Sequence, residues 1–174
     1  MNRPIIIPAI AGDGSSYPVE KMDAHVKGLL HLAVSVFVFD GDELLVQRRA
    51  AAKYHCGGQW ANTCCSHPHW GESLQACAER RLQDELGFTV PLTRHRTVEY
   101  QAPVGEGLSE HERVTLFSAE VDRHSLALEP NPDEVDAVRW ISPDELHREV
   151  ASAPQDFAPW FRIYLQRFPD LTFG

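Results

Sequence analysis

The sequence predicts an α+β protein built around a mixed sheet. Some segments alternate apolar and polar residues every second position, others place apolar residues at helical spacing, and the two kinds do not alternate strictly. The chain has 174 residues, of which 43% are hydrophobic and 24% charged, enough to bury a core of its own. We therefore expect a single domain over residues 1–174, with its core at about 30–165 and an N-terminal extension at 1–29.

The first half begins with strands. The run IIIPAI at residues 5–10 predicts a strand, and the turn-rich residues 11–18 separate it from the body of the protein. Residues 31–49 predict a hairpin, because alternate valines share one face and Asp40-Gly41-Asp42 provides the turn. A helix then begins after Ser73 and ends at Gly87, with an apolar stripe of Leu74, Ala78, Leu82 and Leu86.

The second half mixes both periods. Two strands are expected around a loop at residues 104–110, and a third strand precedes two helices. Ser142 and Pro143 provide a cap and a first-turn residue for the first of these helices. The expected strands are 95–103, 112–121 and 135–142, and the expected helices are 142–150 and 157–168.

Composition limits the partners and the compartment. The formal net charge of −9 argues against nucleic acid or an anionic membrane as a partner. The run at 5–10 is too short to span a membrane and lacks the features of a signal peptide. We expect a cytoplasmic monomer or weak homodimer, with free thiols at its four cysteines, which are Cys56, Cys64, Cys65 and Cys77.

The segment WANTCCSHPHWGES at residues 60–73 concentrates reactive groups. If it is extended, Cys65 lies on the same side as His67, and Cys64 points the other way into the core. Further along, Glu110 and Glu112 would share one face of a strand. Two adjacent carboxylates repel each other unless a cation or a shared proton lies between them, although this pair alone suits a solvated edge strand better.

Other residues could complete a site. With His67, the histidines His25 and His31 could surround a divalent cation together with the two carboxylates. Basic residues on both sides of the segment indicate an anion pocket, with ordinary surface charge as the alternative. These basic residues are Lys21, Arg48, Arg49, Lys53, Arg80 and Arg81.

Four motifs give a family resemblance. From Lys21 to Phe161 this chain resembles type 1 isopentenyl-diphosphate delta-isomerases, because four of their motifs occur in the typical order. Along the chain these are KMDAHVKGLLH, NTCCSHPHWGES, SEHERV and FAPW. The resemblance implies a Nudix-like α/β/α sandwich. It also implies an isomerase that interconverts isopentenyl diphosphate and dimethylallyl diphosphate, with metal-assisted protonation and deprotonation in isoprenoid biosynthesis.

A Nudix hydrolase is the alternative function. The hydrolase box G-x5-E-x7-R-E-U-x-E-E-x-G-U, with U apolar, can be followed from Ser66 through Glu72 to Phe88. However, its first glycine is Ser66 here, and the glutamate after its arginine is Arg81. A guanidinium in place of a carboxylate removes a metal ligand that hydrolysis needs and adds a phosphate binder.

The resemblance also implies roles for individual residues. Cys65, Glu112 and Tyr100 would be catalytic, and Trp160 would face the reacting carbons. Glu85 would bind a Mg²⁺ ion that arrives with the substrate diphosphate. Lys21, Arg49, Lys53 and Arg81 would bind that diphosphate. A second divalent ion, Mn²⁺, Zn²⁺ or Mg²⁺, would be held by His25, His31, His67, Glu110 and Glu112.

Two departures from the family pattern and one further alternative remain. The spacing of His25 and His31 is one residue shorter than the pattern, and Cys56-Gly57-Gly58 replaces the usual W-P-G. The alternative is a non-catalytic module with a structural zinc ion at Cys65, His67 and His69. No second ligand pair at zinc-finger spacing supports that module.

Overall fold

The computed structural model describes residues 3–174, so Met1 and Asn2 of the expected N-terminal extension lie outside the described residues. Within this range the strands form one sheet. They are β1 (Ile6–Ile10), β2 (Ser16–Glu20), β3 (His31–Asp40), β4 (Glu43–Arg49), β5 (Trp60–Ala61), β6 (Cys64–Ser66), β7 (Thr93–Gly105), β8 (Leu108–Glu120) and β9 (Val135–Ile141). The helices are α1 (Lys21–Lys27), α2 (Leu74–Leu86), α3 (Pro143–Ser152) and α4 (Pro159–Arg167), with a short 3₁₀ helix at Pro154–Asp156.

The sheet is mixed, as the sequence predicts. Its main path runs β2-β1-β3-β4-β5, while β6 and β8 also pair with β3, β7 with β8, and β9 with β4. The β3–β8 pair is parallel and the other strand pairs are antiparallel. Strand β3 is therefore the central strand, and it brings β6 and β8 together at the site described below.

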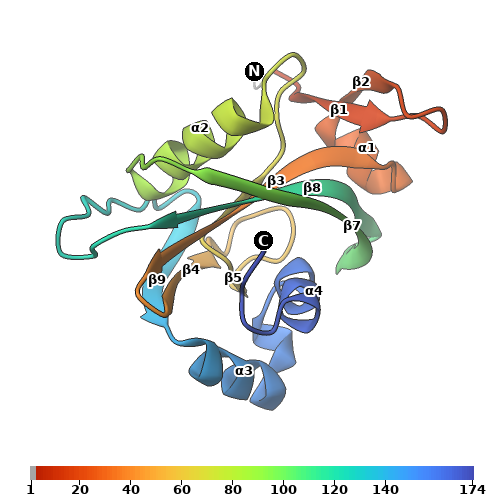
Figure 1. Ribbon diagram of the computed structural model, residues 1–174. Helices are drawn as coiled ribbons and strands as arrows, with labels where there is room; N and C mark the ends of the chain where they lie inside the picture. The colour runs from red at the N-terminus through yellow and green to blue at the C-terminus, as the bar shows by residue number, and fades with distance from the viewer. Residues whose placement is uncertain (1–2) are drawn as a thin grey trace.

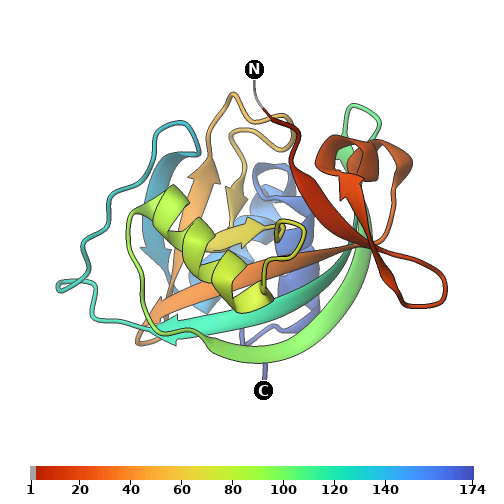
Figure 2. The same cartoon turned by 90° about the horizontal axis from the view of Figure 1, so that it is seen from above.

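Helices cover both faces of the sheet (Figures 1 and 2). Val34, Val36 and Val38 of β3 pack with the buried side of α2 in one apolar cluster. Phe37 belongs to a second cluster, which includes the buried residues of α3 and α4. The alternation of β3 therefore separates two cores, and the predicted α/β/α sandwich is confirmed.

Helix α2 has the predicted ends. The Oγ of Ser73 accepts a hydrogen bond from the N–H of Ala76 at 3.1 Å. Gly87 ends the helix with a φ of 77°, a left-handed conformation that a residue with a Cβ rarely adopts. The apolar stripe faces the core, because Ala78, Leu82 and Leu86 are fully buried.

Three predicted boundaries were wrong. The expected loop at 104–110 belongs mostly to a long hairpin, because β7 extends to Gly105 and β8 begins at Leu108. The turn needs only Glu106 and Gly107, both with positive φ. Near the N-terminus, β2 begins at Ser16 within the segment expected to be a turn. Helix α4 begins at Pro159, since Phe157 is extended and pairs with Trp60.

Helix α1 was missed because it has only seven residues, too few to show a helical period. The Glu20 side chain accepts a hydrogen bond from the N–H of Asp23, and Gly28 ends the helix with a φ of 63°. Before it, β2 lies at the outer edge of the sheet, with Pro18 directly opposite Pro8 of β1. None of the helices within residues 3–174 has the length and apolar character needed to cross a membrane.

Candidate active site and metal site

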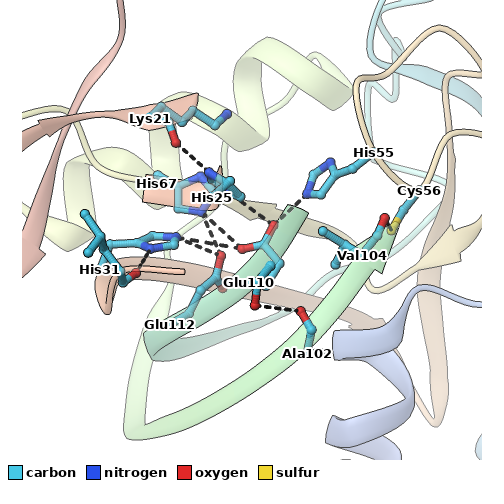
Figure 3. Close-up of polar contacts among 12 residues, drawn as sticks. Lys21, His25, His31, His55, Cys56, His67, Ala102, Val104, Glu110 and Glu112 are labelled. Atoms are coloured by element: carbon cyan, nitrogen blue, oxygen red, sulfur yellow. Dashed lines mark hydrogen bonds and ion pairs between the residues drawn. The ribbon is translucent and has the colours of Figure 1, made fainter. Parts of the chain in front are cut away.

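Five side chains that could bind a metal ion meet in the interior. Each offers a ligand atom, and these atoms lie within 4.8 Å of one another. Figure 3 shows their imidazoles and carboxylates pointing toward one another. All five side chains are buried. This candidate metal group consists of His25 of α1, His31 of β3, His67 just after β6, and Glu110 and Glu112 of β8.

Strand register explains this arrangement. The parallel pairing places His31 directly beside Glu112, and Glu110, two residues earlier in β8, lies on the same face of the strand. His111 points to the other face, where its Nδ1 lies 3.1 Å from the carbonyl of Gly28. The helical turn of α1 brings His25 over the two carboxylates, so the shorter spacing between His25 and His31 still allows both to reach them.

The hydrogen-bond geometry suits a cation. The Nδ1 atoms of His25 and His31 lie 2.6 and 2.7 Å from the backbone carbonyls of Lys21 and Leu29, which can only accept. In the neutral rings each Nδ1 therefore carries the proton, and each Nε2 presents a lone pair. These lone pairs face carboxylate oxygens, with His25 Nε2 at 3.2 Å from Glu110 and His31 Nε2 at 3.5 Å from Glu112.

Electrostatics lead to the same conclusion. Burial would lower the pKa of His31, but hydrogen bonds and charge from Glu110 and Glu112 outweigh it and raise this pKa to about 10. Burial would raise the pKa of Glu110, yet its contacts with Glu112 and the histidines hold it well below the usual range. The cluster therefore attracts positive charge. Three imidazoles and two carboxylates fit a divalent ion with a position free for another ligand.

The adjacent cysteines face opposite ways. Cys64 is fully buried in the core beside α2, whereas Cys65 lines the pocket that also contains Glu112. Asn62 donates both amide protons to backbone carbonyls, so its Oδ1 accepts from the Cys65 thiol at 3.0 Å. Burial raises the pKa of Cys65 to about 12, so the group is a neutral thiol at physiological pH.

A hydrogen-bonded chain of Ser35 and Tyr164 also holds the Cys65 thiol. Ser35 lies opposite Cys65 in the β3–β6 pair, and its Oγ is 3.2 Å from the sulfur. The Tyr164 hydroxyl of α4 is 2.8 Å from the same Oγ. Because the thiol proton goes to Asn62, Ser35 donates to the sulfur and Tyr164 donates to Ser35. The chain fixes the sulfur between two strands and a helix.

Glu112 is held on two sides. The Tyr100 hydroxyl donates to its Oε2 at 2.8 Å, from the opposite position on β7. Its Oε1 lies 2.7 Å from Nε2 of His67. Burial, followed by the charge of Glu112, raises the pKa of Tyr100 well above its usual value, so the phenol keeps its proton. Glu112 thus belongs both to the metal group and to the wall that carries Tyr100.

Four of the six basic residues line the pocket, together with Cys65, Glu112 and Trp160. These four are Lys21, Arg49, Lys53 and Arg81. Arg48 is exposed instead, and Arg80 is paired with Glu72 at 2.7 Å. Burial, with help from Lys53 and Arg81, lowers the pKa of Lys21 to about 8. A bound anion would offset both the burial of Lys21 and the repulsion from its cationic neighbours, as expected for an anion-binding pocket.

Glu85 lies on this cationic side, away from the five-residue group. It accepts hydrogen bonds from Arg81 and Gln47, each at 2.8 Å. Glu134, which the sequence analysis missed, contacts Lys53 and lies 3.4 Å from Arg81. These contacts hold the cations and Glu85 in place on the pocket wall.

His55 and Tyr54 were also missed. They line the pocket from the loop between β4 and β5, and His55 lies 2.6 Å from Glu110. No motif or spacing marked them, because only the fold brings this loop to β8. His69 is exposed and stands outside the metal group, which leaves the structural zinc alternative without its third ligand.

Comparisons with known proteins agree with this architecture. The NUDIX domain family model matches residues 29–161. The DR0079 protein of Deinococcus radiodurans has a TM-score of 0.75 at 14% identity, over 93% of this chain and 98% of that one. A Nudix hydrolase of M. smegmatis, RenU, has a TM-score of 0.58 at 20% identity, over 94% and 92%. At these identities the likeness concerns the fold alone.

Sequence relatives are more specific. An isopentenyl-diphosphate Delta-isomerase of Cereibacter sphaeroides (strain ATCC 17025 / ATH 2.4.3) is 51% identical over 98% of this chain and 96% of its own length. Another, from Roseobacter denitrificans, is 52% identical over 98% and 96%. The fold and the family match define a protein of the NUDIX superfamily. Within it, the chain belongs to the isopentenyl-diphosphate Delta-isomerase family of enzymes.

Proposed function

We propose that this enzyme interconverts isopentenyl diphosphate and dimethylallyl diphosphate. The reaction adds a proton to the terminal alkene carbon and removes another from the carbon nearer the diphosphate. One observation carries the proposal: Cys65 and Glu112, two groups able to exchange protons, line the same pocket as four cationic side chains. The family relationship supports the same substrate class.

Cys65 and Glu112 are proposed as the proton-transfer groups, with Tyr100 assisting Glu112. The thiol is neutral and has a proton to give, while Glu112 has an oxygen held by the phenol at 2.8 Å. Because the reaction is reversible, each group acts as an acid in one direction and as a base in the other. Their separate strands, β6 and β8, suit transfer on two sides of a flat alkene.

Trp160 is proposed to stabilise the positive charge that develops when the alkene is protonated. Its indole is 3% exposed, so water does not screen the ring. A cation over a desolvated indole gains about 2 kcal/mol or more. The burial of this wall also protects a cationic intermediate from capture by water.

Two ions are proposed. Mn²⁺, Zn²⁺ or Mg²⁺ would be held by His25, His31, His67, Glu110 and Glu112, where it would lower the proton affinity of Glu112. Mg²⁺ held by Glu85 would neutralise charge on the substrate diphosphate. Lys21, Arg49, Lys53 and Arg81 are proposed to bind the diphosphate oxygens directly, which aligns the five-carbon chain with Cys65 and Trp160.

The formal net charge of −9 supports a role without a nucleic-acid or membrane partner. We propose that residues 1–174 act as a single domain, as a monomer or weak homodimer in the cytoplasm.

Turnover by the purified protein tests the proposed function. We expect NMR spectra of isopentenyl diphosphate with enzyme, Mg²⁺ and Mn²⁺ in D₂O to show the methyl signals of dimethylallyl diphosphate and deuterium at the exchanging carbons. A Cys65→Ala preparation made in parallel controls for contaminating host isomerase. The proposal fails if the metal-loaded wild-type protein shows no exchange above that control.

A further inference from the structure

His55 lies between the metal group and the cationic side of the pocket. Its imidazole is buried, with Nε2 2.6 Å from Oε1 of Glu110 and Nδ1 3.2 Å from a guanidinium nitrogen of Arg49. Figure 3 shows His55 reaching Glu110 from the side opposite His25 and His67. None of the roles proposed above accounts for this residue.

Arg49 determines which nitrogen of His55 carries the proton. A guanidinium has only donors, so Nδ1 of His55 must accept from it. The single proton of the neutral ring is then on Nε2, where it is donated to Glu110. A proton on Nδ1 would instead set two donors against each other at 3.2 Å.

This hydrogen bond leaves Glu110 with one engaged and one free oxygen. Oε1 receives the bond from His55 and also lies 3.2 Å from Nε2 of His25, whereas the buried Oε2 has no hydrogen-bond partner. Oε2 lies 3.8 Å from Nε2 of both His31 and His67. Holding Oε1 therefore turns Oε2 toward the imidazoles that would share an ion with it.

The surrounding side chains keep His55 in this orientation. Its ring stacks on Tyr54 with centroids 4.2 Å apart and an interplanar angle of 10°, and the Trp160 ring lies 5.7 Å away. Arg49 is itself placed over Trp160, 5.2 Å from the ring centroid. It also donates to the backbone carbonyl of His55 at 3.3 Å.

We propose that His55 is a positioning residue that orients Glu110 for ion binding, with its own tautomer set by Arg49. The proposal deepens the proposed function, since it assumes that the five-residue group holds the divalent ion. The carboxylate–imidazole contact lies outside the set of direct ligands, and loss of such a partner weakens metal binding about 10–100-fold.

Metal affinity tests this without relying on turnover. We expect His55→Phe, which keeps a flat ring beside Tyr54, to raise the Kd for Mn²⁺ about tenfold or more, measured from the EPR signal of free Mn²⁺. We expect His55→Gln, whose amide can still donate to Glu110, to recover most of this affinity. His124→Gln, at an exposed histidine, is the matched control.

Kinetics separate orientation from general packing. We expect His55→Phe to lower kcat more than it changes KM, and His55→Gln to restore kcat. An unchanged Mn²⁺ Kd in a folded His55→Phe protein would overturn the proposal, and so would equal losses in the Phe and Gln variants.

NMR of the wild-type protein gives an answer even if a variant does not fold. Long-range ¹H–¹⁵N spectra of the Mg²⁺-loaded enzyme are expected to show His55 as the Nε2–H tautomer, and the Nδ1–H tautomer would refute the proposal. A wild-type protein whose Mn²⁺ affinity depends on His55 but which fails to isomerise its substrate would leave this inference standing and remove the proposed function.

Discussion

The difference between Cys64 and Cys65 is a property of single residues. Cys65 alone lines the pocket, while Cys64 is fully buried beside α2. We expect Cys65→Ala to reduce turnover on the order of 10²–10⁴-fold or more, because a proposed proton-transfer group is lost, with fold and metal content intact. We expect Cys64→Ala to cost about 1 kcal/mol of stability and little activity.

Isomerase assays, metal analysis and thermal melts of both cysteine variants check this prediction. Cys77→Ala, at another fully buried thiol, is the matched control for core packing. An inactive Cys64→Ala enzyme beside an active Cys65→Ala enzyme would mean that the proposed site is wrong by one residue.

Lys21 gives a pH dependence. Burial and neighbouring cations lower its pKa to about 8, so it is charged below pH 8 and loses its charge above it. If Lys21 binds the diphosphate, kcat/KM is expected to fall as pH rises through about 8. In Lys21→Arg, whose side chain stays charged, the fall is expected to move to higher pH.

The pH profile of kcat/KM for both proteins is the measurement. The comparison removes titration of the substrate itself, which is the same in both assays. Identical profiles for the wild-type and Lys21→Arg enzymes would show that Lys21 does not contribute its charge to substrate binding.

At the residue scale, the sequence predicted those side chains that belong to recognisable local motifs. The orientations of Cys64 and Cys65 followed from strand alternation alone, and the structure agrees. His55 and Glu134 could not be found in this way. Their importance arises from contacts with Glu110 and Lys53, each more than fifty residues away along the chain.

At the scale of elements, helix α2 separates this enzyme from a NUDIX hydrolase. Arg81 occupies a box position that a hydrolase fills with glutamate, and its guanidinium binds Glu85 at 2.8 Å. The helix therefore has one carboxylate fewer for metal ions and one cation more. We expect release of phosphate or pyrophosphate to be negligible beside isomerisation.

Phosphate release and isomerisation measured in the same reaction check this expectation. Release at a rate that matches isomerisation would favour the hydrolase alternative. Both rates are measured with the metal ions present, because chelation would abolish any activity that depends on bound metal and would hide the difference between the two.

Element prediction succeeded where caps and periodicity agree and failed where the signal was short. Ser73 and Gly87 marked the ends of α2 correctly. The hairpin of β7 and β8 was predicted too short, because Gly105 and Gly107 resemble a long loop in sequence although the turn is tight. Helix α1 has seven residues, and its stability comes from caps and from packing near β8.

At the scale of the molecule, the metal group joins separate parts of the fold. Its five side chains come from α1, β3, the end of β6 and β8, so they meet only when the sheet is formed. An ion that binds only the folded state at 100 times its Kd adds about 2.7 kcal/mol of stability. We expect Mn²⁺ to raise the Tm by about 5–10 °C over the chelated protein.

Thermal melts followed by circular dichroism, with EDTA or with Mn²⁺, provide the measurement. The His67→Ala variant, which lacks one proposed ligand, is expected to show a much smaller shift. Equal shifts in both proteins would mean that the ion stabilises the protein from another place.

The two facing prolines of β1 and β2 disfavour edge-to-edge association of two copies of this protein at high concentration. Neither Pro8 nor Pro18 has an N–H, so this opposed pair cannot exchange backbone hydrogen bonds, and the nitrogen of each points away from the other strand. The missing donor of Pro18 therefore lies on the outer border of the sheet. A strand of a second molecule that paired with this edge would lack one backbone hydrogen bond in the middle of the pair. This missing bond disfavours growth into ordered aggregates.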